Sequence, residues 1–179
     1  MNVRTLFAAL AVGYVGLVVL ANWLASRFTI TVPFTDLIAP AGVLCIGAVL
    51  VIRDWLQQLR GLGWAIPLML VAGAASYLAG VAFGWTSLQK IALASVAAFL
   101  VSETIEALIF TPIRNRSLTL GVALSATVAN AIDSYIFLAI AFGSQAFFWG
   151  NFVGKLEMIA VGVAVTAARR VWLPVRPAT

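Results

Sequence analysis

The strongest constraint in this sequence is a series of six long apolar stretches that take up most of its 179 residues. Only 9% of the residues are charged, against roughly 25% in an ordinary soluble domain, so a water-soluble globule is excluded. A helix needs about 20 residues to cross the hydrocarbon layer, where it satisfies its own backbone hydrogen bonds. The apolar stretches run over residues 6–26, 37–52, 64–83, 88–110, 118–142 and 147–168.

These lengths predict an all-α polytopic membrane protein with six transmembrane helices in one bundle. Residues 1–179 then form a single integral membrane domain, because the short connections leave no room for a separate soluble domain. The second stretch is short and opens at Pro40 and Gly42. We therefore expect it to start within the protein or at the membrane interface.

The distribution of Lys and Arg predicts the orientation, because cytoplasmic loops retain positive charge. If the N-terminus is cytoplasmic, Arg27 and Lys90 are the only loop cations on the outer side of the membrane, and the C-terminus is cytoplasmic as well. A cleaved signal peptide at residues 19–21 is the alternative, but the apolar run is longer than the roughly 7–15 residues of a signal core. The cations on the cytoplasmic side are Arg4, Arg53, Arg60, Arg114, Arg116, Arg169, Arg170 and Arg176.

Five charged residues lie well inside the apolar stretches, away from their ends, where each charge costs roughly 2.5–3.5 kcal/mol at a helix centre. The helical rise places Glu103, Asp133 and Glu157 about 16, 25 and 18 Å from the next arginines toward the cytoplasm. Such residues face the protein interior, so the last three stretches are expected to bring ionisable groups to comparable depth. The five residues are Glu103, Glu106, Asp133, Lys155 and Glu157.

Polar residues at helical spacing form a stripe on each of two stretches, which predicts one shared cavity. In the sixth stretch Asn151 and Lys155 share a face, whereas Glu157 points elsewhere, so we expect Lys155 to line the cavity. The stripes are Ser95, Phe99, Ser102 and Glu106 with Glu103 beside them, and Thr127, Asn130, Asp133, Ser134 and Phe137.

Two interpretations of this cluster stay open. In the structural one, Lys155 bridges Glu103 or Asp133, and the polar groups only hold the helices together. In the ligand-binding one, the four carboxylates face a single cation, which indicates a ligand rich in hydrogen-bond donors or a carboxylate that carries protons.

Two pairs of adjacent residues near the ends of the first two stretches also carry expectations. Asn22 and Trp23, near the outer end of the first stretch, either close the cavity or anchor the membrane interface. Arg53 and Asp54 follow one another, so they cannot pair across a helix turn, and a tertiary partner is expected.

Several partners can be weighed from the sequence. The GxxxG motifs at residues 80–84 and 150–154 indicate close helix packing or, alternatively, a homodimer face. The net charge of +5 is explained by topology, so no nucleic-acid partner is expected. The lipid bilayer and a small molecule remain as the expected partners.

The residue inventory offers little for enzyme chemistry. The chain has no His and one Cys, Cys45, which excludes a Ser-His dyad, an HExxH zinc site and a disulfide within the chain. It also has no Walker loop for nucleotide hydrolysis. We therefore expect no enzyme activity, no cofactor and no bound metal.

A set of short motifs extends from Asn22 to beyond Lys155. They are Pro40-Ala41-Gly42, Arg53-Asp54-Trp55-Leu56-Gln57-Gln58 with Gly61, Ala94-Ser95, Ala98-Phe99-Leu100-Val101-Ser102-Glu103 with Glu106, Asp133-Ser134 with Phe137, Ala141-Phe142-Gly143, and Gly154-Lys155-Leu156. In the order and spacing of these motifs the chain resembles the VUT family of queuosine precursor transporters.

The resemblance implies a six-helix inner-membrane importer of 7-cyano- or 7-aminomethyl-7-deazaguanine, which supplies queuosine modification of tRNA. A carboxylate would accept the N–H groups of the guanine-like edge, and the ring would lie against Phe99, Phe137 or Trp23. Glu106 stands where many relatives would have Asp. The expected substrate-binding residues are Asn22, Glu103, Glu106, Asn130, Asp133 and Lys155.

The source of energy is left open. Without an ATPase motif, transport is facilitated, proton-coupled or driven by trapping of the precursor inside the cell. The alternatives to this function are the substrate-binding subunit of an ATP-driven vitamin-type importer, and a small membrane enzyme or assembly factor.

Overall fold

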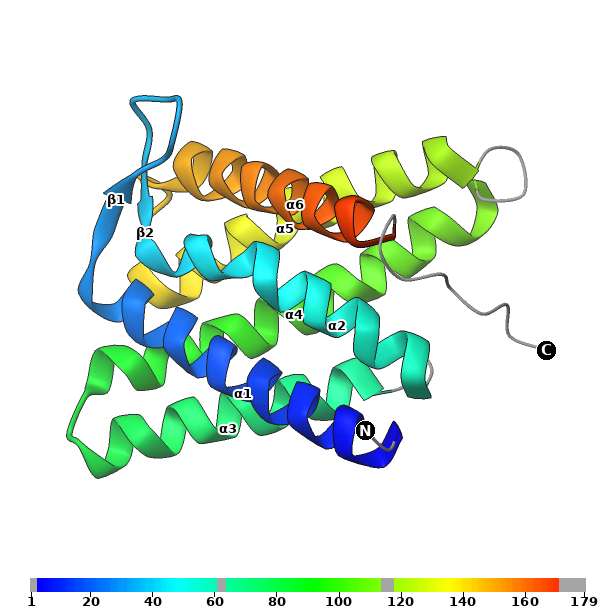
Figure 1. Ribbon diagram of the computed structural model, residues 1–179. Helices are drawn as coiled ribbons and strands as arrows, with labels where there is room; N and C mark the ends of the chain where they lie inside the picture. Colours follow the sequence, from blue (N-terminus) through cyan, green and yellow to red (C-terminus); the bar gives the residue numbers. More distant parts are fainter. Residues whose placement is uncertain (1–2, 61–63, 114–117, 171–179) are drawn as a thin grey trace.

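The computed structural model describes residues 3–60, 64–113 and 118–170, which form a bundle of six α-helices with one β-hairpin (Figure 1). The prediction of an all-α fold with six helices is confirmed. The elements are α1 Val3–Arg27, β1 Thr29–Thr31, β2 Ile38–Pro40, the 3₁₀ helix η1 Ala41–Cys45, α2 Ile46–Arg60, α3 Ala65–Ala82, α4 Thr86–Ile113, α5 Leu118–Phe142 and α6 Phe148–Arg170.

Successive helices run in opposite directions, and aromatic contacts at the two ends of the bundle show this. At one end the rings of Phe7 and Trp64 lie 5.2 Å apart, with the Arg60 guanidinium 5.3 Å from the Phe7 ring. At the other end Arg27 lies 4.7 Å from the Trp85 ring. The start of α1 therefore meets the α2–α3 connection, as the predicted topology requires. The predicted cytoplasmic cations Arg114, Arg116 and Arg176 lie outside the described residues.

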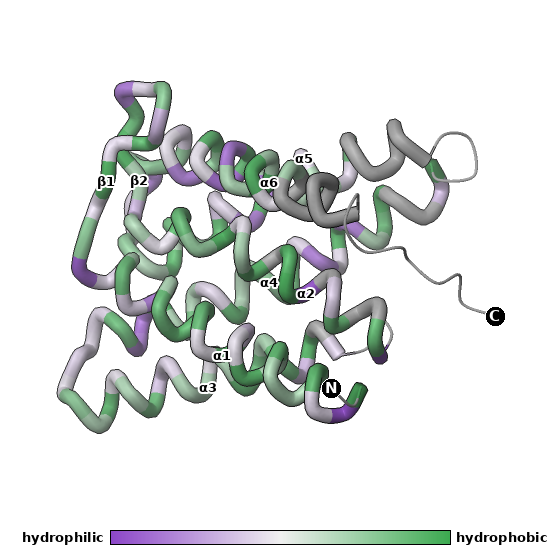
Figure 2. Tube along the Cα trace, in the orientation of Figure 1, coloured by the Kyte–Doolittle hydropathy of each residue, from purple (hydrophilic) through white to green (hydrophobic). Residues whose placement is uncertain are grey.

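Apolar residues dominate the helices, and hydrophilic segments along the chain are short (Figure 2). Within the described residues three helical segments are long and apolar enough to cross a membrane: Val3–Arg27, Thr86–Ile109 and Leu124–Phe142. Two shorter apolar helices cover Ala41–Arg53 and Ile66–Ala82. The structure is thus that of a helical membrane protein, while the count of six spans and the cytoplasmic termini stay predictions.

A short antiparallel hairpin between α1 and α2 is an element that the periodicity of the sequence did not predict. Its strands pair Ile30 with Ala39, and the turn places Phe34 at a positive φ of 60°. Val32 and Ala39 are buried together with Val43 of η1, and Val153 of α6 packs against them. The hairpin thus has a small core of its own against α6. The second apolar stretch starts within the protein, as expected, because η1 is mostly buried.

Glycines let α6 lie directly on this segment. A Cβ on Gly150 would meet the backbone carbonyl of Ile38, and one on Gly154 would meet the Val43 side chain at 3.1 Å. The motif at residues 150–154 therefore serves close packing within the chain. In the motif at residues 80–84, Gly80 packs against Gln89, whereas Gly84 lies in the α3–α4 turn at φ 68°. Three of these four glycines therefore serve packing within the chain and Gly84 serves a turn, and a homodimer stays a prediction.

Candidate functional site

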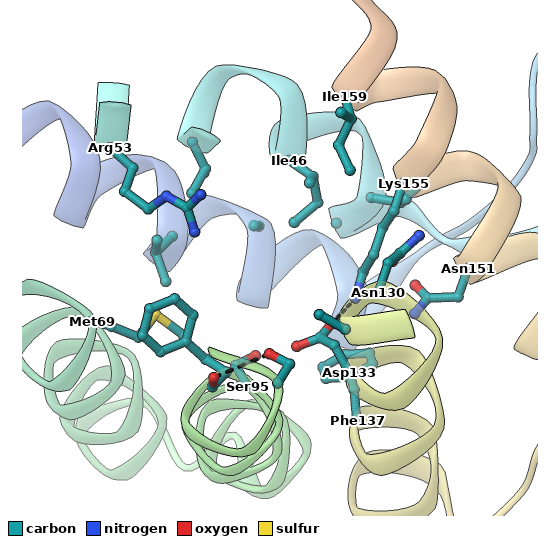
Figure 3. Close-up of a pocket in the computed structure, with 18 of the residues that line it drawn as sticks. Ile46, Arg53, Met69, Ser95, Asn130, Asp133, Phe137, Asn151, Lys155 and Ile159 are labelled. Carbon is teal, nitrogen blue, oxygen red and sulfur yellow. Dashed lines mark hydrogen bonds and ion pairs between the residues drawn. The ribbon is translucent and has the colours of Figure 1, made fainter. Parts of the chain in front are cut away.

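A cavity of about 590 Å³ lies inside the bundle, and all six helices and the hairpin region contribute to its wall. Small-molecule sites have volumes of about 300–1,000 Å³. The α4 stripe from Ser95 to Glu106 faces this cavity, and so does most of the α5 stripe, as the spacing predicted. Figure 3 shows charged and polar side chains from several helices converging there.

An ion pair between Arg53 and Glu103 joins α2 to α4 at the cavity wall. The Arg53 Nη1 donates to Glu103 Oε1 over 2.6 Å, and the side chains are 20% and 30% exposed. Because α2 and α4 have almost no backbone contact, the pair connects helices that otherwise face each other across the cavity. The expected tertiary partner of Arg53 is thus Glu103, whereas the Asp54 side chain lies outside what the structure describes.

A second ion pair joins α5 to α6. The Lys155 ammonium donates to Asp133 Oδ2, and the same ammonium lies 5.8 Å from the centre of the Phe137 ring, within the range of a cation–π contact. The two side chains are 11% and 23% exposed. The bridge that the structural interpretation predicted is therefore present, with Asp133 and not Glu103 as the partner of Lys155.

The two pairs correct the charge count made from the sequence, which assigned one cation to the cluster. Arg53 was counted among the cytoplasmic loop charges, but it lies inside α2, seven residues before the helix ends at Arg60. Its side chain lines the cavity. The cavity therefore contains two cations, each held against a carboxylate, because an unpaired charge at this depth is costly.

Asn22 ties three helices together at the cavity wall. Its Nδ2 donates to Ser76 Oγ over 3.0 Å, and its Oδ1 accepts from Ser95 Oγ over 2.7 Å. Ser76 in turn donates to the Ala72 carbonyl, and Asn22 itself is 4% exposed. Asn22 thus belongs to the cavity. Its neighbour Trp23 instead packs edge-on against Phe28, at 5.7 Å between ring centres, and does not line the cavity.

Two further amides line the cavity where α5 meets α6. The Asn130 Nδ2 donates to the Phe152 carbonyl over 3.1 Å, which fastens α5 to the backbone of α6. Asn151 extends from α6 toward α5, one helical turn before Lys155 (Figure 3). It is 2% exposed.

All six residues expected to bind substrate line this one cavity: Asn22, Glu103, Glu106, Asn130, Asp133 and Lys155. Lys155 lines it and Glu157 does not, which confirms the assignment made from their spacing. Two members of the α5 stripe do not line the cavity, because Thr127 is exposed and Ser134 is fully buried elsewhere.

Comparison with family models identifies the chain. Residues 5–172 match the family described as "Putative vitamin uptake transporter". The chain belongs to this family. The resemblance drawn from the motifs is thereby confirmed at the level of the family. The comparisons with curated proteins and with solved structures found no match.

Membership in the vitamin uptake transporter family agrees with the apolar helices, and it indicates transport of a small molecule across a lipid bilayer. The cavity of this transporter is apolar over much of its wall, with paired charges and amides at a few points. Such a wall is typical of small-molecule sites, in which a few polar groups orient the ligand.

Sequence reasoning missed Tyr14 and Met69, which also line the cavity. The Tyr14 hydroxyl donates to Met69 Sδ over 3.8 Å, and the tyrosine is 1% exposed. One signal could have found Tyr14. It lies eight residues before Asn22 in the first apolar stretch, close to two helical turns, so both residues share a face with Val18 between them.

Proposed function

We propose that this chain imports a queuosine precursor, 7-cyano- or 7-aminomethyl-7-deazaguanine, across the inner (plasma) membrane. The observation that carries the proposal is the convergence of carboxylates and aromatic rings on one cavity of about 590 Å³. Membership in a transporter family supports uptake as the activity. The identity of the substrate comes from the motif resemblance and from the chemistry of the wall.

The carboxylates can accept the N–H donors along one edge of a guanine-like base. A carboxylate has two oxygens and about four acceptor sites, so the bond to Lys155 leaves Asp133 able to bind a ligand. Glu103 keeps acceptor capacity beside Arg53 for the same reason. Two parallel bonds to one carboxylate orient a planar donor edge as well as holding it.

The aromatic side chains of the cavity suit the faces of such a base. Phe99 of α4 and Phe137 of α5 both line it, and Phe137 already lies against the Lys155 ammonium. A heteroaromatic ring stacks on these faces in an offset or edge-on arrangement. In this proposal Lys155 fixes the Asp133 carboxylate in place, while Asn22 and Asn130 hold the surrounding helices in register.

An uptake assay in a strain that cannot make its own precursor tests the proposal. We expect labelled 7-cyano-7-deazaguanine to accumulate with the parent chain and to fall at least about tenfold with Asp133→Asn, which removes the charged acceptor. Tyr135→Phe is the matched control, because Tyr135 is on the same helix and is 57% exposed. Equal uptake by the parent and Asp133→Asn would show that the carboxylate does not bind the substrate.

The energy source needs a second experiment, with the purified chain alone in lipid vesicles. Uptake without any partner excludes the requirement for an ATP-driven subunit. Proton coupling predicts faster uptake when the outside is more acidic. Identical rates of uptake with and without a pH gradient would contradict proton coupling. Facilitated transport then predicts that internal precursor does not exceed the external concentration unless it is consumed.

A further inference from the structure

Asn151 differs from the other amides that line the cavity. Its Nδ2 is buried and has no hydrogen-bond partner in the part of the chain that the structure describes. The corresponding nitrogens of Asn22 and Asn130 each donate to a protein oxygen. A buried donor without a partner destabilises a fold, so one that persists at a cavity wall needs an explanation outside the fold itself.

The backbone beneath Asn151 is held firmly. Its own N–H donates to the Phe147 carbonyl over 2.8 Å, and the preceding Gly150 lies directly on the carbonyl of Ile38. The hairpin therefore fixes the first turns of α6, from which Asn151 extends toward α5 (Figure 3). A side chain on such a support can recognise a ligand without much loss of freedom on binding.

The surroundings of Asn151 supply the complementary group. Asp133 faces the same cavity from α5, and its carboxylate only accepts hydrogen bonds. The Asn151 amide contributes an N–H that a ligand acceptor, such as a carbonyl oxygen, can satisfy. An acceptor and a donor that face one cavity from adjacent helices match a ligand with an N–H beside a C=O.

We propose that Asn151 is a specificity-determining residue that donates through Nδ2 to the ring carbonyl oxygen of the substrate, while Asp133 accepts from the neighbouring ring N–H. The site then selects heterocycles with a lactam edge over analogues in which an amino group replaces the carbonyl. This inference rests on the proposed function, and it adds the chemical feature by which that site chooses its substrate.

Competition in the uptake assay tests this assignment, with guanine as the lactam and 2,6-diaminopurine as the analogue that has an amino group in place of the carbonyl. With the parent chain, we expect guanine to inhibit precursor uptake at the lower concentration. In Asn151→Leu, which removes the donor at similar size, the inhibition constant of guanine should rise on the order of tenfold. The inhibition constant of 2,6-diaminopurine should not rise.

Two further readouts separate binding from folding. Asn151→Leu should melt in detergent at a temperature no lower than the parent, because it removes an unpaired buried donor. A lower melting temperature would indicate a structural bond and would contradict the proposal. Asn151→Asp presents oxygens where the donor was, so the inhibition constant of guanine should rise relative to that of 2,6-diaminopurine, and an unchanged ratio of the two constants contradicts the proposal.

The outcomes for the two proposals are distinguishable. No precursor uptake by the parent chain overturns the proposed function, and this inference with it. Normal uptake by the parent, with an unchanged guanine constant in Asn151→Leu, overturns the role of Asn151 and leaves the proposed function intact.

Discussion

Lys155 of α6 and Asp133 of α5 form an ion pair at the wall of the central cavity, with the ammonium also over the face of Phe137. The pair has a structural consequence and a functional one. It neutralises two charges deep in an apolar bundle, and it aims a carboxylate into the space where a ligand would lie. Substitutions can separate the two effects.

Replacing Lys155 by Met should lower stability and uptake together, because Asp133 is left without its cation. The double variant Asp133→Asn with Lys155→Met removes both charges and should recover most of the lost melting temperature, since mutual removal of a buried pair is often close to neutral. Uptake should stay low, because the charged acceptor is gone. Thermal unfolding in detergent and vesicle uptake measure the two effects. A double variant as unstable as the single one would show that the pair is not the stabilising contact.

The Arg53–Glu103 pair predicts a rescue by charge exchange. Arg53→Glu places two carboxylates together and should destabilise the bundle by about 1–3 kcal/mol, and Glu103→Arg should do so with two cations. Combining the two substitutions restores one cation and one carboxylate at these two positions, with the charges exchanged. The combined variant should melt closer to the parent than either single variant. Additive losses would show that the two residues act independently.

Part of this arrangement follows from the sequence and part does not. Helical spacing placed the α4 stripe correctly, because a long helix with one polar face has a strong periodic signal. The sequence could not choose between Glu103 and Asp133 as the partner of Lys155. That choice depends on the rotation and position of α6 in the bundle. Both are determined by Gly150 and Gly154, which pack directly against the hairpin region.

Arg53 shows a second limit of sequence reasoning. The apolar run ends at residue 52, so Arg53 was counted as a loop charge, yet α2 continues to Arg60. The last turns of α2 are amphipathic. Hydropathy alone therefore predicts the end of the helix too early, at the point where its polar residues begin. The hairpin was missed for a related reason. Its strands have three residues each, too few for an alternating pattern to be visible.

The Asn22 network predicts a loss of stability when its two hydrogen bonds are removed. Asn22→Leu removes the bonds to Ser76 and Ser95, and it should lower the free energy of unfolding by about 1–2 kcal/mol. Thr104→Ala is the matched control, since that hydroxyl bonds only locally to the Leu100 carbonyl on an exposed face. Thermal unfolding compares the two variants. Equal, small effects would contradict a bridging role for Asn22.

The contact of Gly150 with β2 predicts an asymmetry between two glycine substitutions. Gly150→Ala places a methyl group against the Ile38 carbonyl and should destabilise the protein by about 1–3 kcal/mol through overpacking. Gly16→Ala in α1 meets open space, so it should be neutral or stabilise the helix by up to about 1 kcal/mol. Melting temperatures in the same detergent measure both. A stable Gly150→Ala would show that α6 and the hairpin separate easily.

The predicted orientation in the membrane can be tested with two single cysteines. Cys45 is buried and can be replaced by Ala to give a background without thiols. Asp36 is exposed in the hairpin turn, and Arg60 is exposed at the end of α2, at the opposite end of the bundle. A membrane-impermeant maleimide should label the Asp36→Cys variant in intact cells. It should label Arg60→Cys only after the membrane is opened, because positive charge is retained in the cytoplasm. The reverse labelling pattern would show that the topology is inverted, with the start of α1 and the end of α6 on the outer side of the membrane.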